Sequence, residues 1–328
     1  MARALPFAPR PVRANKPLMQ DIFLQTLPFF LIVGLGYGAG KTGFFTEEAT
    51  AWLTKFVFYF ALSAMLFRFA ANLSFHQIFD VSFVAAYLWA TGFVYGVVML
   101  VAFLRRASIE VAAIEAQCGV IGNVGFLGVP MLTLLMGEAA VGPVMLVLSV
   151  DLVVFGSLVV ILVTAARDGT VGVRALGRVA LGVVKNPMIV SIALGLAWSA
   201  LRLPIPAVMN DFLHTLGGAA TPGALFAIGA SLAPKSAERP IVAGWLSGCK
   251  LGLHPAVVAF SALYLFPVAR FDAAVMIAAA SLPVAGNVYI LAQHFRVAPQ
   301  RVSAAILIST ALAVVTVSLV IGWARTLY

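Results

Sequence analysis

Two ionisable side chains lie inside long apolar stretches of this sequence, where a charge is costly. Asp151 lies in LSVDLVVF, and Lys250 lies in SGCKLGLHP with His254 one helical turn further on. Ionisable residues inside such stretches are candidates for ion or substrate chemistry. We therefore take Asp151 as a candidate for proton or ion coupling and Lys250 as a candidate anion contact. Structural roles stay open, because Lys250 can pair with a carbonyl group and Asp151 can form a buried ion pair with Lys250.

Two stretches rich in helix-breaking residues carry the same asparagine motif. The first, GVIGNVGFLGVP, runs from Gly119 to Pro130, and the second, LPVAGN, runs from Leu282 to Asn287. In a helix interior glycine costs about 1 kcal/mol and proline about 3 kcal/mol, so both stretches predict broken helices. A broken helix inside a membrane persists where it is buried in protein or lines a polar cavity. A kinked helix that packs through small residues is the plainer alternative.

The repeated motif supplies the first candidates for substrate binding. Gly122 and Asn123 in the first stretch match Gly286 and Asn287 in the second. An amide side chain both donates and accepts hydrogen bonds, and it costs less to bury than a charge. The N-terminus of a half-helix also attracts an anion. We expect Asn123 and Asn287 to face each other across a central polar cavity and to contact a substrate carboxylate.

The composition is that of an integral membrane protein. Of 328 residues, 62% are hydrophobic and 10% charged, and the mean hydropathy is +1.04. Soluble domains contain roughly 45–50% apolar and about 25% charged residues. The net charge of +9 is spread over short gaps rather than one dense basic run, so we expect no nucleic-acid partner. Glu115, His76 and His214 fall near the ends of apolar stretches, where we expect a solvated face.

A membrane-spanning helix needs about 20 mostly apolar residues, and the sequence predicts ten of them in an all-α membrane protein. The predicted spans are 19–40, 49–71, 81–104, 109–136, 139–166, 186–201, 207–233, 241–266, 271–295 and 299–324. They divide into a five-helix repeat at 19–166 and a second at 186–328, joined by a linker at 167–185. Residues 1–18 are rich in proline and arginine, and we expect a disordered, dispensable tail.

The two predicted halves carry matching motifs. Gly122-Asn123-Val124 recurs 164 residues later as Gly286-Asn287-Val288, and residues 61–67 align with residues 220–226 at an offset of 159. Since five spans is an odd number, the second half must enter the membrane from the opposite face. The result is a 5+5 inverted repeat, which is typical of secondary transporters.

Basic residues predict the orientation in the membrane. Eleven lie in the gaps after the odd-numbered spans: Lys41, Arg105, Arg106, Arg167, Arg174, Arg178, Lys185, Lys235, Arg239, Arg296 and Arg301. Four lie on the opposite side when the tail is left aside: Arg68, Arg202, Arg270 and Arg325. The positive-inside rule then predicts a cytoplasmic 167–185 linker and places both termini outside.

Several stretches resemble the auxin efflux carrier family, including its bacterial malate and malonate carrier branch. The resemblance covers nearly everything after residue 18, and the most specific motif is GNVGFLGVP. It is carried by residues 27–49, 56–67, 122–132, 249–255 and 281–293. The resemblance implies a ten-helix, five-plus-five fold like that of bile-acid symporters and sodium/proton antiporters. It also implies a substrate site where broken helices 4 and 9 cross over.

The resemblance adds further residues to the candidate site. By motif position, Pro130 and Pro283 fall beside the two asparagines on the crossover helices, and Lys250 falls on the family's helix-eight lysine. Ser63 stands where the family often has proline, so the break in the second helix should be softer here. We include all four among the expected substrate contacts.

Together these features predict an efflux-carrier-like permease of the cell inner membrane that moves a small organic anion by alternating access. The expected substrate is a mono- or dicarboxylate such as malate, malonate or an auxin-like acid. A homodimer is a candidate assembly, and no cofactor, metal or enzymatic reaction is expected, because no cluster has catalytic or metal-binding spacing. Two alternatives stay open: a cation/proton antiporter that uses Asp151 as its ion site, and a polytopic membrane protein that does not transport.

Overall fold

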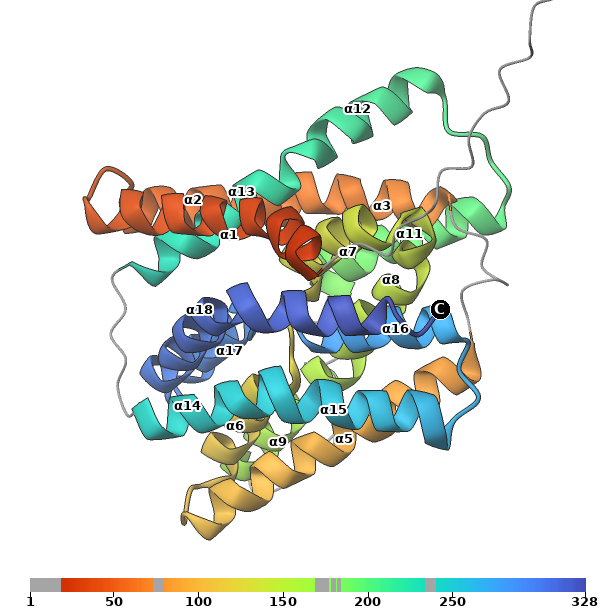
Figure 1. Ribbon diagram of the computed structural model, residues 1–328. Coiled ribbons are helices and arrows are strands. Elements are labelled where there is room, and N and C mark those ends of the chain that lie inside the picture. The colour runs from red at the N-terminus through yellow and green to blue at the C-terminus, as the bar shows by residue number, and fades with distance from the viewer. Residues whose placement is uncertain (1–18, 73–79, 169–176, 178–180, 182–183, 234–239) are drawn as a thin grey trace, which may run out of the picture.

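The computed structural model describes residues 19–72, 80–168, 177, 181, 184–233 and 240–328, and these are almost entirely helical (Figure 1). The expected tail at 1–18, most of the expected linker at 167–185, and His76 lie outside the described residues.

One group of helices comes from the first third of the chain and from the middle. Its members are α1 (Met19–Lys41), α2 (Glu47–Phe56), the π-helical turn η1 (Val57–Ala61), α3 (Leu62–Asn72), α11 (Pro187–Ala200), α12 (Ala207–Gly218) and α13 (Ala220–Leu232). Within the group, α1 packs along α13, and α3 packs against α11 and α12. Segments from both predicted halves therefore share one layer, in the upper part of Figure 1.

The second group contains the remaining described helices. They are α5 (Val81–Leu104), α6 (Ile109–Val120), η2 (Val124–Gly128), α7 (Val129–Met136), η3 (Glu138–Ala140), α8 (Val141–Val150), η4 (Asp151–Phe155), α9 (Gly156–Asp168), α14 (Pro240–Gly248), η5 (Cys249–Leu253), α15 (His254–Phe260), η6 (Ser261–Leu265), α16 (Arg270–Ala280), α17 (Gly286–Phe295) and α18 (Pro299–Ala324). Here α6 packs against α5 and α9, and α16 packs against α15 and α18. The two groups meet mainly where α1 contacts α18 and where α13 contacts η2.

Side-chain caps fix several helix starts. The Thr46 hydroxyl accepts a hydrogen bond from the Ala49 amide at 3.1 Å, and the Asp80 carboxylate accepts one from the Ser82 amide at 2.8 Å. Asn186 does the same for the Met188 amide at 3.0 Å. Such caps satisfy N–H groups that have no partner inside the first turn of a helix, so α2, α5 and α11 begin where the sequence provides an oxygen.

Seven helices among the described residues are long and apolar enough to cross a membrane. They cover Ile22–Lys41, Glu47–Asn72, Val81–Leu104, Glu138–Arg167, Ala207–Leu232, Pro240–Leu265 and Pro299–Ala324. The other three predicted spans are shorter or interrupted. Two of them divide into α6 with α7 and α16 with α17, and the third is α11, whose 14 residues extend only about 21 Å. The protein is therefore an integral membrane protein, while the count of ten remains a prediction.

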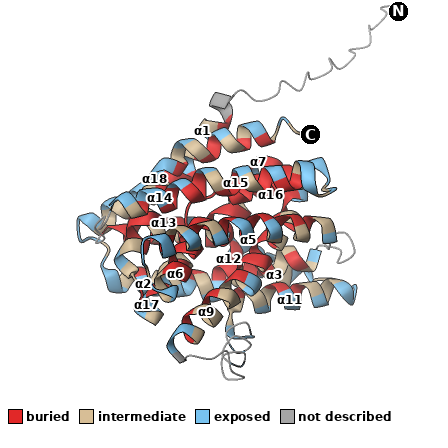
Figure 2. Cartoon of the chain, turned by 90° about the horizontal axis from the view of Figure 1, so that it is seen from below, coloured by how far each residue is buried: buried red, intermediate tan, exposed pale blue. Residues whose placement is uncertain are grey.

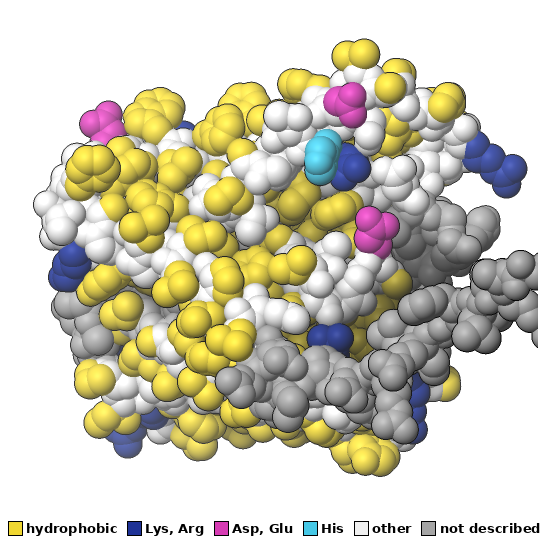
Figure 3. Space-filling view, turned by 45° about the horizontal axis from the view of Figure 1, so that its top comes forward, with side chains coloured by type: hydrophobic (Ala, Val, Ile, Leu, Met, Phe, Trp, Pro, Cys, Tyr) yellow, Lys and Arg dark blue, Asp and Glu magenta, His cyan; other side chains and the backbone are white. Residues whose placement is uncertain are grey.

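The surface is apolar and the interior contains buried polar groups. Large side chains such as Leu31, Leu35 and Phe93 are at least half exposed, and hydrophobic side chains are spread over the face in Figure 3, where charged side chains are few. Buried residues run through the middle of the helix bundle (Figure 2). This distribution suits a protein surrounded by lipid.

Close packing between α1 and α13 depends on glycine. A Cβ atom on Gly36 would lie 2.1 Å from the Phe226 carbonyl oxygen, and one on Gly229 would lie 1.9 Å from that of Val33. Both distances are far below van der Waals contact. Small residues let helix backbones approach in membranes, and here they join the first helix of one predicted half to a helix of the other.

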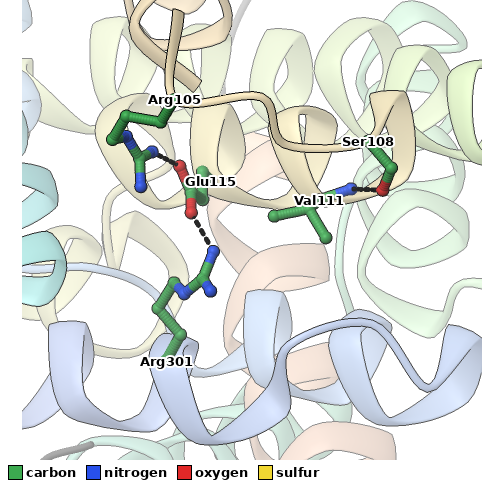
Figure 4. A network of polar contacts seen from close by, with 5 residues as sticks. All are labelled: Arg105, Ser108, Val111, Glu115 and Arg301. Carbon is green, nitrogen blue, oxygen red and sulfur yellow. Dashed lines mark hydrogen bonds and ion pairs between the residues drawn. The ribbon is translucent and has the colours of Figure 1, made fainter. Parts of the chain in front are cut away.

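One sequence-based expectation about charge was wrong. Glu115 on α6 does not face solvent, because its side chain is only 1% exposed and is paired with Arg105 and Arg301 (Figure 4). Burial of a carboxylate needs such partners. The cluster fixes α6 to the end of α5 and the start of α18. His214, in contrast, is exposed as expected.

Candidate functional site

Two helices break at the predicted stretches, and the breaks cross each other. Helix α6 ends at Val120 and α16 ends at Ala280. Between the helical segments, Gly122 and Val284 form an antiparallel backbone bridge. The two extended segments therefore run past each other in opposite directions inside the second helix group.

Backbone groups freed by one break are largely satisfied by the other. The Asn123 N–H donates to the Pro283 carbonyl at 2.9 Å, and the Ala285 N–H donates to the Ile121 carbonyl at 3.0 Å. The Val284 N–H donates to the Ser309 hydroxyl at 3.1 Å. Unpaired backbone groups inside a membrane cost several kcal/mol each, so these bonds stabilise the crossing. These donors are already paired, and a ligand is not needed to satisfy them.

A small cavity of about 60 Å³ lies at the crossing. Of the nine residues that the sequence placed at the site, five line it: Gly122, Asn123, Asp151, Gly286 and Asn287. They come from both breaks and from the π-helical turn η4. π-Helical turns are frequent at functional sites, and η1 and η2 also contribute lining residues, Phe58 and Phe126.

A much larger cavity of about 860 Å³ adjoins the small one, because both are lined by Asp151, Gly286 and Asn287. Residues from both helix groups line it, including Thr50 and Thr54 of α2 and Ser157 and Tyr289 of the second group. Pockets for small molecules usually measure about 300–1,000 Å³. The volume suits a small organic ligand held between the two groups.

Three side-chain oxygens at the small cavity are buried and lack a hydrogen-bond partner among the described residues. They are Oδ1 of Asn123, Oδ1 of Asn287 and Oδ2 of Asp151. The Asn123 and Asp151 side chains are 5% and 3% exposed. Most buried polar atoms in proteins are paired, so these three atoms are candidates for contact with a ligand.

The other carboxylate oxygen of Asp151 belongs to a buried polar chain. Tyr87 on α5 donates its hydroxyl hydrogen to Asp151 Oδ1 at 2.8 Å. The Tyr87 ring lies 6.0 Å from the His254 ring, and His254 Nε2 lies 3.1 Å from the Thr91 hydroxyl. The expected alternative for Asp151, an ion pair with Lys250, is not among the ion pairs of the described residues.

Lys250 is fully buried behind the crossing and lines neither cavity. Its ammonium group donates to the Ala280 carbonyl at the end of α16 and lies 3.3 Å from His254 Nδ1. A cation at the C-terminus of a helix interacts favourably with the helix dipole. The geometry thus matches the carbonyl-pairing role that the sequence left open for Lys250.

The remaining candidates, Pro283, Pro130 and Ser63, line neither cavity. Pro283 contributes the carbonyl that binds the Asn123 amide. Pro130 lies in the first turn of α7, where a missing N–H is tolerated. Ser63 donates to the Phe58 carbonyl at 3.2 Å, five residues back, beside the π-helical turn η1. The second predicted span is thus distorted, not broken, at Ser63.

Sequence reasoning missed several polar lining residues, among them the amides of Asn186 and Gln117. Asn186 caps α11 and lines both cavities, and Gln117 lines the larger one while its side chain donates to the Phe155 carbonyl at 2.5 Å. Gln117 is a polar residue within a predicted span, which was a usable signal. Asn186 lies at the first residue of a predicted span, where a cap is the ordinary interpretation.

Comparison with known proteins identifies the family. The profile of a family described as "Membrane transport protein" matches residues 21–321. The chain belongs to this family. It is the auxin efflux carrier family that the motifs resemble, and the match covers both helix groups and the crossing.

A curated relative is similar over almost the same length. The chain is 32% identical over 309 residues to a protein of Rhizobium meliloti (strain 1021) named "Putative malonate transporter". The alignment covers 92% of this chain and 95% of the relative. The chain is therefore a member of a family of membrane transporters.

Proposed function

We propose that this protein is a secondary transporter that moves a small organic anion, a mono- or dicarboxylate, across the cell inner membrane by alternating access. The observation that carries the proposal is the convergence of Asn123 and Asn287 on one cavity where two broken helices cross. Gly122 and Gly286 line that cavity beside the two amides, and Asp151 is the coupling residue.

The chemistry of the crossing favours a carboxylate. Helix α17 begins at Gly286 with no side-chain cap, so its N-terminal dipole is directed toward the cavities that Gly286 and Asn287 line. A helix N-terminus attracts an anion, and the amide nitrogens of the asparagines can donate to it. The name of the relative supports malonate as the first substrate to test, with malate and an auxin-like acid as the next candidates.

The arrangement of the helices supports alternating access. The large cavity lies between the two helix groups, and each group takes segments from both predicted halves. We propose ten spans in two inverted halves, 19–166 and 186–328, so that one group can move relative to the other and open the cavity to each side in turn.

The test is uptake of labelled malonate, malate and indole acetate into proteoliposomes that contain the purified protein. We expect saturable uptake of at least one carboxylate above that of protein-free vesicles, with competition by the unlabelled acid. A protein that inserts and remains monodisperse but moves none of the three, under any imposed ion gradient, would contradict the proposal.

One observation supports a second candidate function. The unpartnered Oδ2 of buried Asp151 is the kind of group that a cation/proton antiporter uses as its ion site. In that case the same vesicles would exchange a cation for protons with no carboxylate present. Exchange that requires a carboxylate would instead assign Asp151 to coupling.

A further inference from the structure

The three unpartnered oxygens at the small cavity are all hydrogen-bond acceptors. Oδ1 of Asn123 and of Asn287 belong to neutral amides, and Oδ2 of Asp151 belongs to a carboxyl group. Since a buried acceptor without a partner is destabilising, one ligand that reaches all three atoms would stabilise the crossing. A proton on Asp151 would satisfy a single oxygen and leave the two amides as they are.

Two of the donors close to the cavity are already used elsewhere. The Asn123 amide N–H binds the Pro283 carbonyl, and the Tyr87 hydroxyl binds the other oxygen of Asp151. The Asn186 side-chain oxygen accepts from the first turn of α11 and adds another acceptor to the lining. The cavity wall is therefore rich in side-chain oxygen atoms, which are ligands that suit a cation.

We propose that the small cavity binds a sodium ion through Asn123 Oδ1, Asn287 Oδ1 and Asp151 Oδ2. Carboxylate and amide oxygens are hard ligands that suit hard cations. One carboxylate and two neutral amides carry a single negative charge, which a monovalent ion neutralises. A divalent ion would leave a net positive charge in the membrane interior, which is costly.

The small cavity, of about 60 Å³, has room for an ion. The adjoining cavity, of about 860 Å³, offers far more room for the body of a dicarboxylate. In unwound segments of transporters, helix ends of opposite polarity separate the ion from the anion. Here α6 ends at the crossing with its C-terminus, and α17 begins there with its N-terminus.

The charges around the large cavity give the ion a function. Among its described lining residues, two carboxyl groups, Glu47 and Asp151, face one ammonium group, Lys55. An entering anion would add negative charge to a lining that is already net negative. A sodium ion at the crossing offsets Asp151 and offers a positive charge to the substrate. This coupling rests on the proposed function, whereas the ion site itself does not.

The test measures sodium without any substrate. Equilibrium dialysis of the purified full-length protein against radioactive sodium, with choline chloride holding the ionic strength constant, should show saturable binding. We expect Asp151→Asn, Asn123→Ala and Asn287→Ala each to weaken this binding at least about tenfold. Glu138→Gln removes an exposed carboxyl outside both cavities, and its sodium binding should equal that of the wild type.

Two binding results would overturn the ion site. In one, the folded wild-type protein shows no saturable sodium binding. In the other, Asp151→Asn binds sodium as tightly as the wild type does. If the variants fail to fold, the melting temperature of the wild type decides, because it must rise with sodium and not with equal choline. Carboxylate uptake that is unchanged in choline would overturn the coupling of the ion to the substrate while leaving the proposed function intact. Sodium binding without any carboxylate uptake would overturn the proposed function alone.

Discussion

At the scale of single residues, the two asparagines of the repeated motif differ in how firmly they are held. The Asn123 carbonyl accepts from the Leu127 and Gly128 amides, both at 3.0 Å, and its own N–H is bound across the crossing. Asn287 lies in the first turn of α17 and lines both cavities. Asn123 is thus fixed by the backbone around it, and Asn287 lies where the small cavity opens into the large one.

We expect both amides to contribute to substrate binding. Asn123→Ala and Asn287→Ala should each weaken carboxylate binding about 5- to 150-fold, because a lost partner for a buried group costs roughly 1–3 kcal/mol. Isothermal titration with malonate measures the effect. Asn210→Ala is the matched control, since Asn210 binds Arg68 and lines neither cavity. Unchanged affinity in both site variants would remove the crossing from the binding site.

Lys250 should affect stability more than affinity. Lys250→Met keeps the apolar stem and leaves the Ala280 carbonyl without its ammonium partner, which costs about 1–3 kcal/mol. We expect a lower melting temperature and nearly wild-type malonate affinity in the fraction that stays folded. A large loss of affinity at unchanged melting temperature would instead make Lys250 a substrate contact.

At the scale of helices, the local sequence predicts where a helix breaks better than what the break contacts. The spacing of Gly122 and Asn123 is repeated at Gly286 and Asn287, and both copies lie at helix interruptions that cross. The local sequence does not show that Lys250 binds the end of α16, or that Glu115 pairs with Arg301, which lies 186 residues further along the chain. Those pairs depend on which helices become neighbours in space.

The glycine series in α1 offers a controlled test of helix packing. A Cβ atom on Gly36 would lie 2.1 Å from the Phe226 backbone, whereas one on Gly38, two residues further on, meets nothing within 4 Å. Gly36→Ala must therefore force α1 away from α13. Gly38→Ala adds only helix propensity, worth up to about 1 kcal/mol.

We expect Gly36→Ala to lower the melting temperature and Gly38→Ala to keep or raise it. Thermal unfolding of the purified proteins in one detergent, followed by circular dichroism, measures both. Equal melting temperatures for the two variants would show that the contact between α1 and α13 is not as close as described.

At the scale of the whole molecule, the sequence predicted the ranges of the helices but not their grouping. Hydropathy places α1 and α13 in separate spans, and only the structure shows that they share a layer with α3 and α11. The large cavity lies between the layers, so its lining comes from segments that are distant in sequence. Hydrophobic periodicity carries no information about such pairings, which is why Asn186 was missed.

Contacts at the ends of the helices bear on orientation. Arg167 pairs with Glu110 and donates to the Phe295 carbonyl. These contacts bring together the chain next to the gaps that follow the third, fifth and ninth predicted spans. On the other side, Arg68 binds Asn210 at 2.9 Å, and the rings of Phe271 and Tyr328 lie 5.0 Å apart. These pairings agree with a chain that alternates sides at each predicted span.

Labelling of single cysteines can show which side of the membrane each set of gaps faces. The eleven-to-four excess of basic residues predicts that the gaps after odd-numbered spans are cytoplasmic. The native thiols of Cys118 and Cys249 are buried, so single introduced cysteines can report the sides in intact cells. A membrane-impermeant maleimide should label Leu203→Cys, in an exposed gap after the sixth span, and should fail at Thr170→Cys until the membrane is permeabilised. Both sites must react in permeabilised cells for the comparison to hold. The reverse labelling pattern would mean that the protein has the opposite orientation in the membrane. The 167–185 segment and the arginines beside Glu110 and Glu115 would then lie outside.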